Sequence, residues 1–274
     1  MANTTNILQY LKLKRGLDFS GNRTSMINRR IDKRIFATIS SDINEYHNYL
    51  EQNELELDKL IDVLTINVSR FFRNTFNFEF IADYILPKLI MEKIKSNNSP
   101  LRVWSAGCAA GEEPYSMSIL IKEIIEKEGL NLITTIIATD IDKKILKSAA
   151  EGIYSFESIR SIKYHLLEKY FNTRENVFQL KSEIKEMVSF SEFDMLDAKS
   201  YFPHESIYGS FDIILCRNLL IYFNTGFQEI IYKKLYRALN PGGYLILGEA
   251  EVLPEKYKNK FNRTSKECKI YKKR

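Results

Sequence analysis

From Leu101 onward, short apolar segments alternate with longer segments of helical periodicity, and this alternation constrains the fold more than any other feature. The pattern predicts strands at Leu101–Ser105, Ile133–Thr139, Met187–Phe193, Phe211–Cys216 and Tyr244–Gly248, and helices at Glu112–Lys127, Asp142–Glu151 and Thr225–Leu239. Strands that alternate with helices form a parallel sheet with helices on both faces. The segment Glu267–Tyr271 is expected to pair with the last of these strands as an antiparallel edge strand.

The N-terminal part of the chain shows helical periodicity throughout. Apolar residues recur at helical spacing around Met26–Ile35 and again through Tyr46–Leu64. Ser20 and either Ser41 or Asp42 are expected to cap the helices. The polar segment at residues 95–100 ends in proline and marks a domain junction.

These patterns predict an all-helical domain at residues 1–90 and a sheet domain at residues 91–274. Between the second helix and third strand of the sheet domain, apolar and polar residues alternate around Val177–Leu180. This alternation predicts a small β insertion at about residues 155–187, although a simple covering loop is the alternative.

The net charge of +5 is unevenly distributed. Gln9–Arg34 holds eight Lys or Arg against two acids, whereas Asp42–Asp62 holds seven acids against one Lys. Two interpretations stay open. The charged residues form solvent-exposed helix faces that partly pair with each other, or the basic helix docks an acidic partner.

Several classes of protein are excluded. The longest apolar runs are far shorter than the ~20 residues that a membrane-spanning helix needs, and the first residues lack the pattern of a signal peptide. The three Cys and three His are scattered, with no CxxC pair and no zinc-ligand spacing. We therefore expect a soluble cytoplasmic protein without a disulfide framework and without a metal site.

Polar residues follow the first four strands. The small residues of Ser105–Gly111 lead into a helix N-terminus after the first strand, and Asp140, Asp194 and Arg217–Asn218 follow the next three. Ligands of open α/β sheets bind at the carboxyl ends of the strands, so these residues predict a nucleoside-binding cleft. Asp140 alone could instead cap the helix that follows it.

The sequence also narrows the choice of nucleoside. No Gly-Lys-Ser/Thr of a P-loop is present, and the glycines do not complete the G-x-G-x-x-G of a dinucleotide site. The helix opens with Glu112 and Glu113, whose carboxylates would repel a pyrophosphate but could hold an ammonium group. These features favour S-adenosylmethionine, which combines an adenosine with an amino-acid end.

Four blocks carry a family resemblance: Leu64–Arg73, Arg102–Ser116, Ala138–Asp142 with Gly152–Tyr154, and Cys216–Phe223. In this order they resemble the signature blocks of the chemotaxis receptor glutamate methyltransferases. The resemblance implies a class I S-adenosylmethionine-dependent methyltransferase fold, a doubly wound seven-stranded sheet with an N-terminal helical domain and a small β insertion. It also implies methyl transfer to glutamates of chemoreceptor cytoplasmic helices, with S-adenosylhomocysteine as the product.

The resemblance assigns roles to the residues near the cofactor. Asn67, Ser69 and Arg73 would reach the cofactor, and Arg73 would also lie near the methyl-transfer centre. Glu113 would bind the cofactor's ammonium group, and Asp140 its ribose. Ser69 stands where Thr is common in the family, which keeps the hydroxyl.

The later blocks supply the rest of the implied site. Asp194, where some members have Asn, and Met195 would contact the adenine. Arg217 and Asn218 would complete the pocket, and Tyr222 would orient the incoming carboxylate without acting as a base.

The implied partner is the acidic surface of receptor helices, which the basic helix would meet through Arg23, Arg29, Arg30 and Arg34. The insertion at Phe171–Leu180 lacks the Gly-Pro-rich turn of members that tether to a receptor's C-terminal peptide, so the resemblance leaves tethering open. We expect a monomer that binds no nucleic acid and does not insert into membranes.

Three alternatives remain at this point. A nucleic-acid methyltransferase would share the fold and cofactor, but the fourth strand end lacks the Pro-Pro-Tyr type of motif for a flipped base. A non-catalytic regulator could keep the cofactor-binding pocket. Cys216 as a nucleophile is the third, although it lies in a strongly apolar strand without an evident base.

Overall fold

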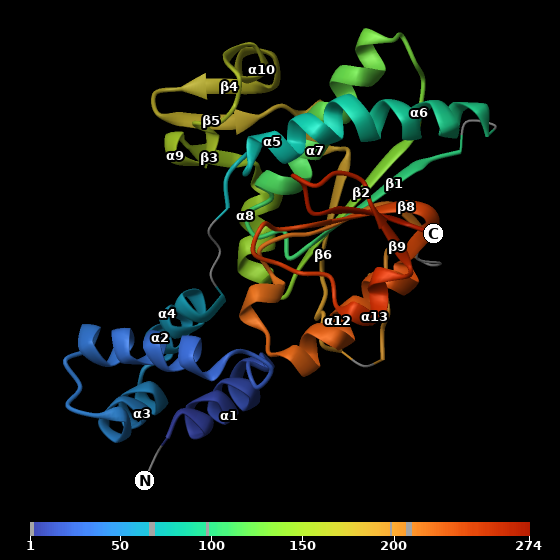
Figure 1. Ribbon diagram of the computed structural model, residues 1–274. Helices are drawn as coiled ribbons and strands as arrows, with labels where there is room; N and C mark the ends of the chain where they lie inside the picture. Colours follow the sequence, from blue (N-terminus) through green and yellow to red (C-terminus); the bar gives the residue numbers. More distant parts are fainter. Residues whose placement is uncertain (1–2, 66–68, 97–98, 198, 207–209) are drawn as a thin grey trace. The chain divides into compact units, whose positions relative to one another are not determined.

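The computed structural model describes residues 3–65, 69–96, 99–197, 199–206 and 210–274 (Figure 1). By their contacts, the residues group into two compact units. The first comprises Met1–Asn67 and Ile221–Gln228, and the second comprises Val68–Leu220 and Glu229–Arg274.

The first unit is helical. Its helices are α1 (Thr4–Arg15), α2 (Thr24–Ala37), α3 (Ile43–Gln52) and α4 (Glu54–Thr65). Their apolar faces form one buried core, whose members include Ile7, Leu11, Ile27, Ile31, Tyr46, Leu50, Leu57, Leu60 and Leu64.

The N-caps of these helices test the sequence-based assignments. Asp42 caps α3, because its carboxylate accepts hydrogen bonds from the backbone N–H groups of Asn44 and Glu45, as predicted. The assignment of Ser20 is wrong, because α2 begins at Thr24 and Arg23 occupies the N-cap position. Ser20 instead donates its backbone N–H to the Asp18 carboxylate, within the loop before the helix.

The second unit is built on a seven-stranded sheet in the described residues, with the strand order β6-β2-β1-β7-β8-β10-β9. The strands are β1 (Leu101–Ala106), β2 (Thr134–Asp140), β6 (Val188–Glu192), β7 (Phe211–Cys216), β8 (Leu239–Leu247), β9 (Phe261–Arg263) and β10 (Ile270–Lys273). The first five in spatial order pair in parallel, and β10 is antiparallel to both β8 and β9. The doubly wound α/β prediction is therefore confirmed.

The C-terminal strand differs from its prediction in one respect. It pairs with β8 as expected, with Tyr271 opposite Leu245, but it also pairs with β9, with Tyr271 opposite Arg263. The edge strand is thus β9, a three-residue strand whose short length gave no clear periodicity in the sequence.

Helices surround this sheet (Figure 1). They are α5 (Thr75–Phe80), the π-helical turn η1 (Ile81–Ile85), α6 (Leu86–Lys95), α7 (Glu112–Lys127), α8 (Lys143–Glu151), α13 (Glu255–Lys258) and the part of α12 (Thr225–Ala238) that follows Gln228. The start of α12 and most of a short 3-10 turn, η2 (Leu220–Tyr222), are counted with the first unit. Buried residues of the sheet such as Val103, Ile136 and Ile213 share a core with Leu86 of α6 and Ile119 of α7. None of the helices in the described part of the chain is long and apolar enough to cross a membrane.

The predicted insertion is a separate three-stranded antiparallel sheet with the order β3-β5-β4. It contains β3 (Ile153–Ser155), α9 (Phe156–Ile159), α10 (Tyr164–Tyr170), β4 (Phe171–Arg174), β5 (Val177–Leu180) and α11 (Ser182–Lys185). Arg174 pairs with Val177, so the β4–β5 turn has only two central residues, Glu175 and Asn176. Glu175 has a positive φ of 52°, as such tight hairpin turns require.

Candidate cofactor site

The carboxyl ends of four parallel strands lie at the same edge of the sheet. Ala106 of β1 pairs with Thr139 of β2, and Asp140 pairs with Glu192 of β6. On its other side, β1 pairs with β7, where Ser105 lies opposite Leu215. The strand order reverses at β1, because β2 lies on one side of β1 and β7 on the other. The carboxyl edge at such a switch point is where open α/β sheets bind ligands.

The loop after β1 is held against Asp140. The backbone N–H of Ala109 donates to Asp140 Oδ2 at 3.0 Å, and the N–H of Asp142 donates to Oδ1 at 3.1 Å. Burial raises the pKa of Asp140, although these two hydrogen bonds act in the opposite direction. A carboxylate has about four acceptor positions, so Asp140 keeps the capacity to accept a further hydrogen bond from a ligand hydroxyl.

The helix-cap alternative for Asp140 is excluded by its neighbour. Asp142 is the N-cap of α8, and its Oδ1 accepts hydrogen bonds from the N–H groups of Lys144 and Ile145. Asp140 instead fixes the β1 loop, which leaves its carboxylate at the edge of the sheet.

Replacing Asp140 with alanine is expected to weaken S-adenosylhomocysteine binding by about 10- to 100-fold, since hydrogen bonds to a charged group contribute about 1.5–3 kcal/mol. Calorimetric titration measures the effect, and Asp83→Ala, which removes an exposed acid of the same unit that is not assigned to the site, is the control. Equal affinity in wild type and Asp140→Ala would remove Asp140 from the site.

Arg217 joins three parts of the second unit. Its Nη1 donates to Glu113 Oε2 at 3.1 Å, and its Nη2 donates to the Arg73 carbonyl at 2.6 Å and to Asn74 Oδ1 at 2.9 Å. The guanidinium also lies over the ring of Phe78, 5.1 Å from its centroid. This buried cation therefore contacts residues that lie more than 100 positions away from it in the sequence.

Glu113 lies in the first turn of α7, and both of its carboxylate oxygens are engaged. Ser105 at the end of β1 donates its hydroxyl to Oε1 at 2.8 Å, while Arg217 donates to Oε2. The carboxylate is thus fixed at the switch point, where the favourable field of the helix N-terminus adds to the charge of Arg217.

Glu112 and Glu113 do not act as a pair, contrary to the expectation that both could hold an ammonium group. Glu112 is only 3% exposed and accepts a hydrogen bond from Ser158 Oγ at 3.4 Å. Ser69 hydrogen-bonds the same carboxyl, and burial raises the pKa of Glu112. Glu112 therefore anchors the segment after Ser69 to the β insertion, and Glu113 alone faces Arg217.

Asn218 lies in a tight turn after β7, with a left-handed φ of 58°. The buried carboxylate of Glu251 accepts the N–H groups of Leu219 and Leu220, at 2.9 and 2.7 Å, and that of Gly248 at 2.6 Å. A Cβ on Gly248 would lie 2.9 Å from the Asn218 nitrogen, so no side chain fits there. Sequence reasoning missed Glu251, although an acid three residues after a strand-ending glycine was a possible signal.

The third strand end brings Asp194 and Met195 to the same edge. The N–H of Phe193 donates to the Asp140 carbonyl at 3.0 Å, which ties this segment to β2. Asp194 Oδ1 accepts the N–H of Leu196 at 2.7 Å, and Met195 is 6% exposed. The segment thus places the polar turn at Asp194 beside the buried thioether of Met195.

Four non-glycine residues with left-handed φ angles surround these groups. They are Phe72 (50°), Asn74 (62°), Ala109 (48°) and Asn218 (58°). Such residues are uncommon and are concentrated at functional sites. The backbone around Arg73 and at the ends of β1 and β7 is therefore held in conformations that the fold must impose.

Two predicted site residues are not placed with this group. Asn67 lies outside the described residues. Tyr222 is counted with the helical unit, where its carbonyl accepts the N–H of Arg23 at 2.9 Å and the neighbouring Phe223 forms a bridge with Asn22.

Other chemistry has less support. Within the described ranges, no group of three or more His, Cys, Asp or Glu side chains is arranged to hold a metal ion. Cys216 is fully buried in β7, and this burial raises the pKa of its thiol, which disfavours the nucleophilic thiolate.

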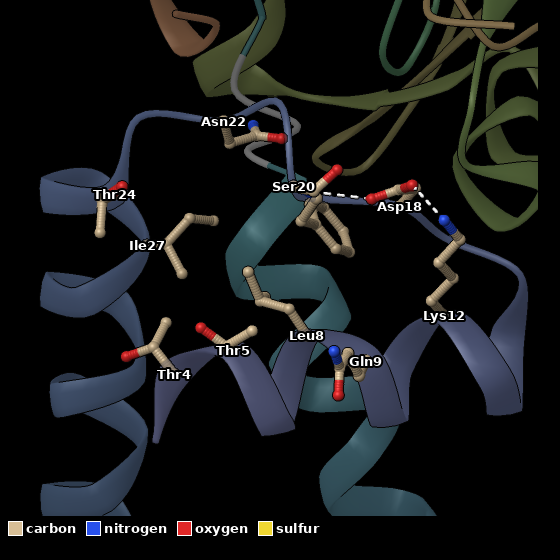
Figure 2. Close-up of a pocket in the computed structure, with 11 residues that line it drawn as sticks. Thr4, Thr5, Leu8, Gln9, Lys12, Asp18, Ser20, Asn22, Thr24 and Ile27 are labelled. Carbon is tan, nitrogen blue, oxygen red and sulfur yellow. Dashed lines mark hydrogen bonds and ion pairs between the residues drawn. The ribbon is translucent and has the colours of Figure 1, made fainter.

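The helical unit contains a pocket of about 420 Å³ between α1 and the loop before α2 (Figure 2). Its lining combines apolar side chains such as Leu8 and Ile27 with hydroxyl and amide groups, and Lys12 pairs with Asp18 at 2.6 Å. Among the described residues, none of the predicted cofactor-site residues lines this pocket.

Comparisons with known proteins identify the family of both parts of the chain. Residues 67–270 match the family model of the CheR methyltransferase SAM binding domain, and residues 3–65 match that of the CheR methyltransferase all-alpha domain. A chemotaxis protein methyltransferase of Borreliella burgdorferi is 35% identical over 241 residues, which cover 87% of this chain and 83% of that protein. Chemotaxis protein methyltransferase 2 of Vibrio cholerae is 32% identical over 246 residues, covering 88% and 82% of the two chains.

Proposed function

Because the chain belongs to the CheR methyltransferase family, whose sheet domain binds S-adenosylmethionine, we propose that it methylates glutamate side chains of chemoreceptor cytoplasmic helices. The products are γ-glutamyl methyl esters and S-adenosylhomocysteine. The observation that best supports this proposal is the joining of Glu113 and the Arg73 segment by Arg217 at the switch point of the sheet.

The residues at this edge fit S-adenosylmethionine. The fixed carboxylate of Glu113 can hold an ammonium group, and Asp140 keeps acceptor capacity for ribose hydroxyls. Gly107 has a φ of 75°, and a Cβ there would lie 3.1 Å from Leu219. The backbone of the loop after β1 therefore carries no side chain at this position. Asp194 and Met195 would contact the adenine, while Asn67, Ser69 and Asn218 would complete the pocket.

When bound, the cofactor supplies a methyl group attached to a positively charged sulfur, and this sulfur becomes a neutral thioether when the methyl group is transferred. A glutamate is already ionised at pH 7, so its oxygen attacks without a general base, which suits a site without histidine. The chain's own contribution is positioning and the exclusion of water. Arg73 would attract and align the carboxylate, and the Tyr222 hydroxyl would orient it.

The receptor would dock on the basic face of α2. The four predicted arginines differ in whether they are available to a partner. Arg34 forms a bidentate ion pair with the buried Glu56, with Nη2 2.6 Å from Oε2. Arg30 donates to the carbonyl of Val63. The side chains of Arg23 and Arg29 are exposed, so these two are the better candidates for contact with an acidic helix.

Reversing the exposed charges of Arg23 and Arg29 to Glu is expected to lower kcat/KM for the receptor about tenfold at low salt. Exposed charges act mainly on the encounter rate and are screened by salt, so the difference should shrink at high ionic strength. The control reverses two exposed lysines of the sheet domain, Lys127 and Lys147. Equal losses in both variants, or a loss that salt does not change, would contradict docking on α2.

The remaining parts of the proposal concern localisation, oligomeric state and attachment to the receptor. We infer that the protein acts as a cytoplasmic monomer. Its β4–β5 turn has two central residues, which leaves no long loop to receive a receptor's C-terminal peptide, and we propose docking without such a tether.

The proposed function is tested by incubating the protein with methyl-labelled S-adenosylmethionine and receptor-bearing membranes. Label that stays with the receptor and is released as methanol by mild base would identify carboxyl methyl esters. A receptor whose candidate glutamates are replaced by alanine is the control. Transfer to nucleic acid instead, or cofactor binding without any transfer, would favour the two alternative functions.

A further inference from the structure

We propose that Lys234 is a positioning residue that holds the Asp194–Asp197 turn and thereby sets the affinity for the adenine end of the cofactor. This inference rests on the proposed role of Asp194 and Met195 as the adenine contacts. Lys234 lies on α12, 40 positions from Asp194 in the sequence, and is only 2% exposed.

The ammonium group of Lys234 contacts both ends of the turn. Its Nζ donates to the Asp194 carbonyl at 3.2 Å and to the Asp197 carbonyl. The turn is closed by the N–H of Asp197, which donates to the same Asp194 carbonyl at 3.1 Å. A single side chain therefore fixes the two carbonyl groups between which Met195 lies.

The other groups around Lys234 attract its positive charge, but burial of the side chain opposes that charge. The Nζ lies 4.9 Å from the centroid of the Phe193 ring, and the Asp194 and Asp197 carboxylates attract it from further away. Burial outweighs these attractions, because it lowers the pKa of Lys234. A methionine would fill the same space without this cost, so the lysine is better explained by what it holds than by packing alone.

The expected consequence is specific to one end of the cofactor. Without the ammonium group, the Asp194 carbonyl and the backbone on either side of Met195 lose their fixed orientation. Contacts to the adenine would weaken, whereas Glu113 and Asp140 are held by other partners and would keep their contacts with the amino-acid and ribose ends.

The test is calorimetric titration of S-adenosylhomocysteine into wild type and Lys234→Met. We expect affinity to fall about tenfold, with a matching rise in KM for S-adenosylmethionine and little change in kcat at saturation. Lys233→Met is the matched control, because Lys233 is the exposed neighbour on the same helix. Lys234→Arg, which keeps a charged donor, should recover part of the affinity.

Each outcome decides between distinct explanations. Unchanged affinity in Lys234→Met would overturn the inference, and so would a fall in kcat without a change in KM. If wild type bound S-adenosylhomocysteine but Asp194→Ala bound it equally well, the adenine assignment of the proposed function would fail instead. If Lys234→Met does not fold, Lys234→Gln, which keeps a neutral donor, is titrated in its place.

Discussion

Replacing Arg73 with alanine is expected to lower turnover by about 10²-fold, the loss typical when a group that aligns the reacting atoms is removed and the attacking carboxylate is misplaced. S-adenosylhomocysteine affinity should fall much less. The substitution keeps the Arg73 carbonyl, which accepts the hydrogen bond from Arg217, so the backbone of the segment should stay in place. Steady-state kinetics with receptor, combined with calorimetric titration of the product, separates the two effects.

Arg70→Ala is the control for Arg73→Ala, because it removes the same side chain three residues earlier in the same segment. A variant Arg73→Lys, which keeps the charge but not the planar guanidinium, shows whether charge alone is sufficient. Turnover that stays within about twofold of wild type in Arg73→Ala would show that Arg73 does not act at the reacting centre.

Replacing Arg217 with methionine is expected to have the largest effect on the fold itself. Removing one partner of a buried ion pair costs about 3–5 kcal/mol, because the other charge is left without compensation. Here the loss would leave Glu113, the Arg73 carbonyl and Asn74 without their shared donor. Denaturant unfolding should show the lower stability, and cofactor affinity should fall with it.

A double-mutant cycle controls for the loss of Arg217. In Glu113→Gln with Arg217→Met the carboxylate left without its cation is gone, so the double variant should be less destabilised than the sum of the single variants. Strictly additive losses would mean that the 3.1 Å contact between the two side chains does not couple them.

Much of the fold could be predicted because local pattern and tertiary structure agree. The predicted bounds of α7 and β7 match those observed, since both are long, strongly patterned segments at the centre of the sheet domain. The carboxyl ends of parallel strands necessarily share an edge, which is why Asp140, Asp194 and Arg217 could be grouped without a structure.

What the sequence could not supply depends on contacts between distant residues. Glu251 had only a weak local signal and Lys234 had none, because each contacts backbone groups more than 30 positions away. The different environments of Glu112 and Glu113 arise from the rotation of about 100° between consecutive helix residues, which places the first side chain in the core and the second toward Arg217. Ser20 failed as a cap because cap-forming residues also stabilise loops.

The left-handed residues Phe72, Asn74, Ala109 and Asn218 bear on how this protein could be made more heat-resistant. Strained backbone of this kind costs on the order of 1–3 kcal/mol at each position and persists only where the surroundings impose it. The region proposed to hold the cofactor is therefore also a region where the backbone conformation lowers stability. Substitutions that relax it would raise the melting temperature at the expense of methyl transfer, so thermostable variants should be sought in the helical unit and the β insertion.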